Sequence, residues 1–303
     1  MEMYVVSHGG QNLAFHAETN RYSLTTGGSL WEMVKNPSLL LYDGKEYTAE
    51  FPAPVEVKVV DDPTATGIAA VYRGFAGSDI QVFTRAEIEK TTGDILFTVR
   101  VEKDKFGEVL DVNFPAPWHF DTQDPADYTV LSRMQGALFP AGTPIKLANG
   151  LLNERDGYMP IYGQKRGESG YLAIFETSYD ARYWADGGDI QPRFTMSLGH
   201  IGYPRKMRYL FRQNFDYNVM AKLYRSYVQK RGRLVTLAEK EIRNPAVKRL
   251  YGCPIIHSGV ATHISPDSIY HDKEHPEKND YWTAFDVYAD ALRALKEKGL
   301  KKA

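Results

Sequence analysis

The sequence predicts a mainly β protein built from antiparallel sheets, and three observations support this prediction. Tyr, Phe and Trp make up 13% of the 303 residues, and 25 Gly and 16 Pro divide the chain into short segments. Aromatic residues favour strands, whereas Gly and Pro favour turns. Apolar and polar residues alternate in many segments, as at 55–60, so that each strand has a buried face and a wet face. We find roughly fourteen candidate strands at the spacing of a sandwich or barrel.

The first block of strands occupies about the first hundred residues. Its candidate strands lie at 13–17, 22–26, 39–42, 55–60, 67–72 and 80–84. The clearest hairpin joins 86–90 to 95–101 through Thr92, Gly93 and Asp94, because a turn sequence divides two alternating segments. This block is therefore expected to form antiparallel sheet.

A second block of strands runs from about Leu131 to Phe211. The segments 159–163 and 170–176 flank the polar residues 164–169, which are expected to form the tip of another hairpin. Two further strands are predicted at 194–198 and 206–211. The sandwich is therefore predicted to occupy residues 1–214.

The pattern changes near Phe215 from period two to a helical period. Residues 218–231 contain neither Gly nor Pro and place their apolar positions on one helical face, with Gly232 as the cap. A short helix is predicted at 237–242, so that linker helices occupy 215–243.

The C-terminal segment, 244–303, is expected to contain one β–α unit. The apolar run 252–257 has the character of a buried parallel strand, and residues 282–298 form an amphipathic helix after a polar loop. A crossover helix normally leads to a second parallel strand. We therefore expect an incomplete (β/α) barrel that would continue beyond Ala303.

Several segments together resemble bacterial glycoside-hydrolase-like proteins in which a galactose-mutarotase-like β-supersandwich precedes a (β/α) barrel. They are 159–163, 170–174, 203–211, 216–227, 232–240 and 250–252. The resemblance extends from about Pro140 to the end of the chain. It implies a carbohydrate-active enzyme, a glycoside hydrolase acting on oligo- or polysaccharides, whose catalytic carboxylates lie on later barrel strands. The catalytic residues are thus left unassigned, and we expect this chain alone to be catalytically silent.

Charge and composition limit the partners. The chain has 37 Lys and Arg against 38 Asp and Glu, a net charge of −1, which gives no field to attract nucleic acid or an anionic membrane. No apolar run approaches the ~20 residues of a membrane span. A single Cys and the lack of a phosphate-binding glycine motif leave no expected cofactor. The expected partner is carbohydrate, and no oligomeric state follows.

The N-terminal residues do not have the pattern of a signal peptide. They lack its basic flank and long apolar stretch. We expect a cytoplasmic protein, or an exported one whose leader is absent from this sequence.

Two segments combine aromatic rings with carboxylates, as sugar sites do. Trp118 and His119 lie in one predicted loop, and Asp180 and Trp184 lie in another. The faces of pyranose rings pack on aromatic rings, while polar groups bind the hydroxyls. These four residues are candidate substrate contacts, and the alternative is that the aromatic rings fill the sandwich edge.

Two histidines are candidates at the barrel. His257 follows the apolar strand and His263 lies in the next loop, on the side where barrel enzymes carry their chemistry. The alternative for His257 is a strand-end His bonded to a backbone carbonyl. His271 and His275 are four residues apart, but the residue after His271 is Asp272, not the glutamate of a helical zinc motif. A polar loop is preferred there, and no metal site is predicted.

Two other functions remain open. A free-standing aldose epimerase of the mutarotase kind needs a His acid and a Glu base in one cleft, and the segment 118–120 departs from its Asn-His-aromatic motif. A non-catalytic carbohydrate-binding module is the second alternative. Neither the sugar nor the linkage follows from the residues.

Overall fold

The computed structural model describes residues 2–75, 77–133, 136–148, 157–253, 261–266, 271–282 and 285–301. The chain divides into two compact units, Met1–Lys230 and Arg231–Ala303. The predicted mainly β fold with antiparallel sheets is confirmed in the first unit. The domain limits at residues 214 and 243 stay predictions.

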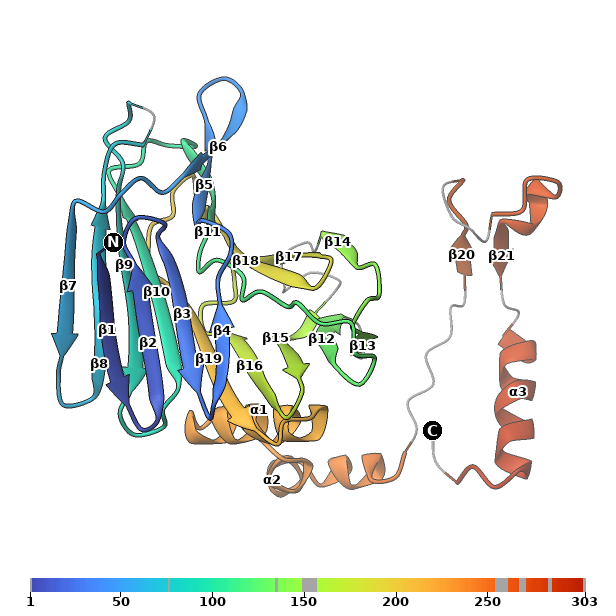
Figure 1. The fold of residues 1–303 in the computed structure, drawn as a ribbon. Helices are drawn as coiled ribbons and strands as arrows, with labels where there is room; N and C mark the ends of the chain where they lie inside the picture. The colour runs from blue at the N-terminus through green and yellow to red at the C-terminus, as the bar shows by residue number, and fades with distance from the viewer. Residues whose placement is uncertain are drawn as a thin grey trace. The chain divides into compact units, whose positions relative to one another are not determined.

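A nine-stranded antiparallel sheet forms the main layer of the first unit (Figure 1). Across the sheet its strands are β13 (Ala137–Pro140), β12 (Tyr128–Arg133), β15 (Gly157–Arg166), β16 (Ser169–Phe175), β19 (Arg205–Gln213), β10 (Ile95–Glu102), β9 (Gln81–Glu89), β8 (Ala65–Tyr72) and β7 (Glu56–Asp61). Alternation decides which side chains enter the core. In β9, Val82, Thr84, Ala86 and Ile88 are buried, and the residues between them are half-buried on the opposite face.

Two smaller sheets complete the sandwich. The four-stranded sheet contains β1 (Met3–His8), β2 (Gln11–His16), β3 (Arg21–Thr26) and β4 (Ser29–Glu32). The six-stranded sheet contains, in order, β14 (Lys146–Ala148), β17 (Ala181–Asp186), β18 (Asp189–Thr195), β11 (Val109–Asn113), β5 (Ser38–Tyr42) and β6 (Glu46–Glu50). All three sheets contribute to one buried apolar cluster, which lies between them.

The core is rich in aromatic rings. Tyr209 packs edge-on against Phe97, Trp118 and Tyr171, with ring centroids 5.5–5.9 Å apart. Such edge-to-face pairs add to the free energy gained by burying the ring area. The aromatic excess seen in the sequence thus serves the sandwich core.

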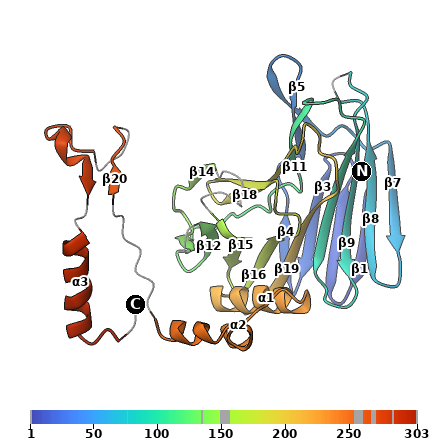
Figure 2. The same cartoon turned by 180° about the vertical axis from the view of Figure 1, so that it is seen from behind.

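Helix α1 (Tyr217–Lys230) covers part of the other face of the nine-stranded sheet and matches the predicted helix (Figure 2). Its Met220 is buried with Ile161, Leu172 and Leu210 in a second, smaller cluster. Gly163 permits this contact, because a Cβ there would lie 2.7 Å from Met220 Sδ. β16 is therefore buried on both faces.

Local differences from the predicted strands have simple causes. The hairpin through Thr92 is confirmed, but the two segments predicted at 80–84 and 86–90 form the single strand β9. The hairpin at 159–176 is also present, but Gln164 and Arg166 belong to β15, so only Gly167 and Glu168 form the turn. The polar side chains there include Gln164, which is buried in the sandwich and belongs to the strand.

The second unit contains short elements. They are α2 (Leu237–Arg243), a 3-10 turn at Pro245–Leu250, β20 (Ala261–His263), a 3-10 turn at Pro276–Lys278, β21 (Asp280–Trp282) and α3 (Phe285–Glu297). Thr236 caps α2 through a reciprocal pair of hydrogen bonds with Glu239. The predicted loop between strand and helix contains the antiparallel pair β20–β21. Of the predicted strand 252–257, residues 254–257 lie outside the described residues, so the barrel stays a prediction.

Candidate carbohydrate-contact site

The hairpin β17–β18 carries the first candidate residue, Trp184. The sequence suggested a loop here, but Trp184 lies in β17 directly opposite Gln191 of β18, on the outward face of the sheet. Its side chain is half-buried, and the guanidinium carbon of Arg193 lies 5.4 Å from the ring centroid. The strand holds Trp184 at the surface of the six-stranded sheet.

His119 reaches the same hairpin from the segment after β11. Its Nδ1 lies 3.2 Å from Asp189 Oδ1, which also accepts the Phe120 N–H at 3.2 Å. Lys35 Nζ lies 3.4 Å from the other carboxylate oxygen. The His119 side chain is 42% exposed and that of Asp189 only 13%, so the carboxylate anchors a ring that reaches solvent.

The structure brings His119 and Trp184 to one end of this hairpin. Asp189 and Gln191 are two residues apart on β18 and therefore face the same side, and Gln191 is the partner of Trp184. An imidazole and an indole at one edge can bind a sugar hydroxyl and a sugar ring face. The carboxylate beside His119 belongs to Asp189, which already interacts with His119, the Phe120 N–H and Lys35. A mutarotase needs a glutamate as its base, and this site does not provide one.

Trp118, although adjacent to His119 in the chain, belongs to the core. It is 1% exposed, and its ring packs edge-on against Tyr209 and Phe211 at 5.9 and 5.5 Å. Trp118 therefore offers no surface to a sugar ring. Its ring fills the sandwich, as the alternative interpretation of the sequence expected.

Asp180 stands at the other end of β17 in a buried ion pair. It accepts hydrogen bonds from the Tyr203 hydroxyl at 2.5 Å and from Arg205 Nη1 at 2.9 Å. The Arg205 side chain is fully buried and stacks on Tyr203, 3.5 Å from the ring centroid. Burial lowers the pKa of Arg205 to about 10, although the charge of Asp180 and its hydrogen bond act in the opposite direction. The Asp180 carboxylate is thus paired with Arg205.

One group on the same sheet was missed by the sequence argument. Asp111 of β11 is fully buried and accepts from Arg182 Nη2 of β17 and from Thr195 Oγ1 of β18. Arg182 faces Arg193 across the hairpin. Recognising 181–186 and 189–195 as alternating strands would have placed these side chains on one face.

The two barrel candidates stay predictions. His257 lies outside the described residues. His263 ends β20, where its backbone pairs with Asp280. His271 Nδ1 lies 3.0 Å from the Ile264 carbonyl oxygen, and the side chain of His275 is 52% exposed.

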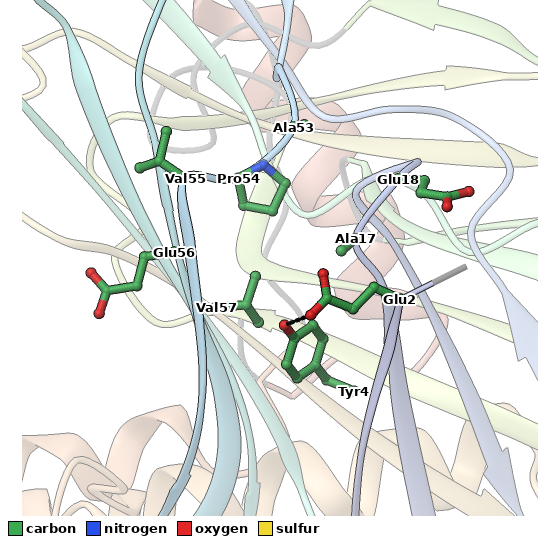
Figure 3. A pocket seen from close by; sticks show the side chains of 9 residues that line it. All are labelled: Glu2, Tyr4, Ala17, Glu18, Ala53, Pro54, Val55, Glu56 and Val57. Carbon is green, nitrogen blue, oxygen red and sulfur yellow. Dashed lines mark hydrogen bonds between the residues drawn. The ribbon is translucent and has the colours of Figure 1, made fainter.

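A hollow of about 400 Å³ lies between the ends of β1 and β7 (Figure 3). Glu2 and Tyr4 point toward each other across its floor and share a hydrogen bond. Glu18 and Glu56 also line it. Three carboxylates and several apolar side chains line this hollow, and it is separate from the site at the β17–β18 hairpin.

Within the part of the chain that the structure describes, no group of three or more His, Cys, Asp or Glu is placed to hold a metal ion. Among the described helices, none is long and apolar enough to cross a membrane.

The fold defines a class of protein. The mainly β fold is similar to that of glycoside hydrolases of known structure. Among solved structures, the α-N-acetylgalactosaminidase NagBb from Bifidobacterium bifidum in complex with GalNAc matches 98% of this chain, with 32% sequence identity and a TM-score of 0.79. The ligand-free NagBb structure matches the same share, at 31% identity and a TM-score of 0.78. This chain covers 50% of NagBb, so it spans half the length of that enzyme.

The other comparisons show weaker similarity or no match. The GH36 α-galactosidase AgaA from Geobacillus stearothermophilus matches 70% of this chain and is covered to 41%, at 12% identity and a TM-score of 0.41. No protein-family model and no curated protein matches the chain.

Proposed function

We propose that this chain forms the sandwich-bearing half of a glycoside hydrolase that releases α-linked N-acetylgalactosamine. One observation carries the proposal: 98% of the chain superimposes on NagBb, an α-N-acetylgalactosaminidase whose structure holds GalNAc, with 32% identity. A shared fold alone would not indicate a substrate. Identity at this level over nearly the whole chain supports a related sugar.

The catalytic carboxylates are proposed to lie on barrel strands outside the sandwich. Three acids at or beside the hairpin support this, because they are already bonded to a cation or a histidine: Asp111 to Arg182, Asp180 to Arg205 and Asp189 to His119. These aspartates are therefore suited to holding the site together.

His119 and Trp184 are proposed to contact the saccharide. Both reach solvent and lie at one end of the β17–β18 hairpin, and Asp189 fixes the orientation of His119. The imidazole would bond a hydroxyl and the indole would pack on the ring. Trp118 and Asp180 would support these positions from the core.

The proposal is tested with the 303-residue chain itself. Saturation-transfer NMR with GalNAc and with glucose should show transfer to GalNAc that is reduced in His119→Ala and Trp184→Ala. The same chain should release no 4-nitrophenol from 4-nitrophenyl α-N-acetylgalactosaminide. Equal transfer to both sugars in all variants contradicts the contact, and turnover by this chain contradicts the placement of the carboxylates.

A further inference from the structure

The outer face of the six-stranded sheet carries two neighbouring arginines, only one of which is paired with a carboxylate. Arg182 of β17 and Arg193 of β18 are direct cross-strand partners. Side chains in such a pair lie side by side, and like charges in these positions repel each other. This arrangement needs a compensating anion.

Asp111 supplies only part of that compensation. It pairs with Arg182 Nη2, while its other oxygen accepts from Thr195 Oγ1 at 2.8 Å. Among the described residues Arg193 has no hydrogen-bond or ion-pair partner, and its guanidinium lies over the Trp184 ring. The Nε atoms of both arginines are buried without a hydrogen-bond acceptor. Buried donors without acceptors are costly and uncommon, so each one requires an explanation.

The arginine pair itself carries more positive than negative charge, since only Asp111 forms an ion pair with it. The next ion pair along the sheet, Asp180 with Arg205, is internally balanced. Burial lowers the pKa of Arg193, and the nearby Arg182 adds to this while Asp111 opposes it. A second anion beside Arg193 would therefore remove repulsion that Asp111 alone leaves in place.

Geometry also favours an oxyanion. A guanidinium presents its N–H donors in a planar fork that matches carboxylate and sulfate oxygens. Trp184 holds Arg193 over its ring and fixes one side of the position. The two forks lie on adjacent strands, so a single anionic group can accept from both.

We propose that Arg182 and Arg193 bind the acidic group, carboxylate or sulfate, of an acidic saccharide on this face, with Trp184 beside it. The oxyanion site stands on the arginine pair alone. That its ligand is a saccharide rests on the proposed glycoside hydrolase function. The site is separate from hydrolysis and would hold an acidic substituent or a neighbouring acidic residue of a glycan.

The test is a titration followed by tryptophan fluorescence and by calorimetry, using the intact chain. The ligands are glucuronic acid, N-acetylgalactosamine 6-sulfate, neutral N-acetylgalactosamine and inorganic sulfate. The two acidic sugars should bind more tightly than the neutral one, and the arm with the stronger signal identifies carboxylate or sulfate. Raising the NaCl concentration should weaken binding, because the attraction is electrostatic.

The decisive variant is Arg193→Gln, because it leaves the pair between Arg182 and buried Asp111 intact and so preserves folding. It should weaken binding of the acidic sugar about 10-fold or more, the loss expected for a charged hydrogen bond. Arg100→Gln is the matched control, since Arg100 also stacks on an aromatic ring, Phe83, at 4.6 Å on another sheet. It should leave binding unchanged.

The outcomes separate the proposals. Equal affinity for neutral and acidic sugars, or unchanged binding in Arg193→Gln, overturns the oxyanion site. Inorganic sulfate binding as tightly as both acidic sugars overturns the saccharide ligand. Because binding is measured without turnover, failure to hydrolyse an α-N-acetylgalactosaminide affects only the proposed function.

Discussion

Tyr162 and Tyr209 share a hydrogen bond inside the sandwich, with their hydroxyl oxygens 2.9 Å apart on strands separated by β16. Tyr171 lies on β16 between them, its ring centroid 6.1 Å from that of Tyr162. Burial raises the pKa of Tyr162, Tyr171 and Tyr209 above the ordinary value, because the phenolate would lose its hydration.

Stability should therefore fall in alkali. Below pH 10 these tyrosines are protonated in both states, and above it the unfolded chain loses protons that the folded protein keeps. Each such tyrosine lowers the free energy of unfolding by about 1.4 kcal/mol per pH unit above about pH 10. Urea denaturation between pH 9 and 11 measures the slope.

A variant isolates one contribution to that slope. Tyr171→Phe should reduce the loss of unfolding free energy per pH unit by the contribution of one tyrosine. This change in slope does not depend on how the substitution affects stability at neutral pH. Tyr179→Phe, at a side chain that is 77% exposed, is the control and should keep the slope. A stability curve that is flat up to pH 11 would contradict the account of the core.

Removing Asp180 should destabilise the sandwich strongly. Asp180→Ala leaves the fully buried Arg205 guanidinium without its carboxylate, and breaking such a pair typically costs about 3–5 kcal/mol. Asp186→Ala removes an exposed acid at the other end of β17 and should cost far less. Chemical denaturation compares the two variants, and equal effects would contradict the role of the pair.

Substitutions of Trp118 and Trp184 should differ in their effect on the free energy of unfolding. Trp118→Ala should lower the free energy of unfolding by about 3–5 kcal/mol, because it leaves a cavity in the aromatic core. Trp184→Ala should change the free energy of unfolding much less, because that side chain is half-buried at the surface. Thermal unfolding in a calorimeter measures both, and a small loss for Trp118→Ala would place its ring outside the core.

Gly170 should not tolerate even a methyl group. A Cβ at this position would lie 2.2 Å from Phe215 Cδ1 and 2.6 Å from the backbone oxygen of Gln164. Gly170→Ala should therefore cost about 1–3 kcal/mol through overpacking. Ala173→Gly on the same strand is the control, since it removes a methyl group without creating a clash. Comparable unfolding curves for Gly170→Ala and the wild type would contradict the close packing.

The sequence predicted the sandwich because period-two alternation and turn residues are local signals. The hairpin through Thr92 and helix α1 follow from such signals alone. The site was predicted only in part. Trp184 and His119 were named, but their shared position depends on Asp189, which lies 70 residues from His119 in the chain.

The contact that pairs Asp111 with Arg182 could not be predicted for the same reason. It joins β11 to β17 across β18, and the order of strands in a sheet is not a local property of the sequence. Trp118 shows the converse, since it lies outside the strands as predicted while its ring is buried in the core. Tertiary packing decided both positions.

The central claim is tested most directly by the rate at which the complete gene product that contains these residues hydrolyses 4-nitrophenyl α-N-acetylgalactosaminide. We expect turnover with a kcat/KM well above that for 4-nitrophenyl α-galactoside, because the chain resembles an α-N-acetylgalactosaminidase over 98% of its length. No turnover with the N-acetylgalactosaminide, or a clear preference for the galactoside, would contradict it.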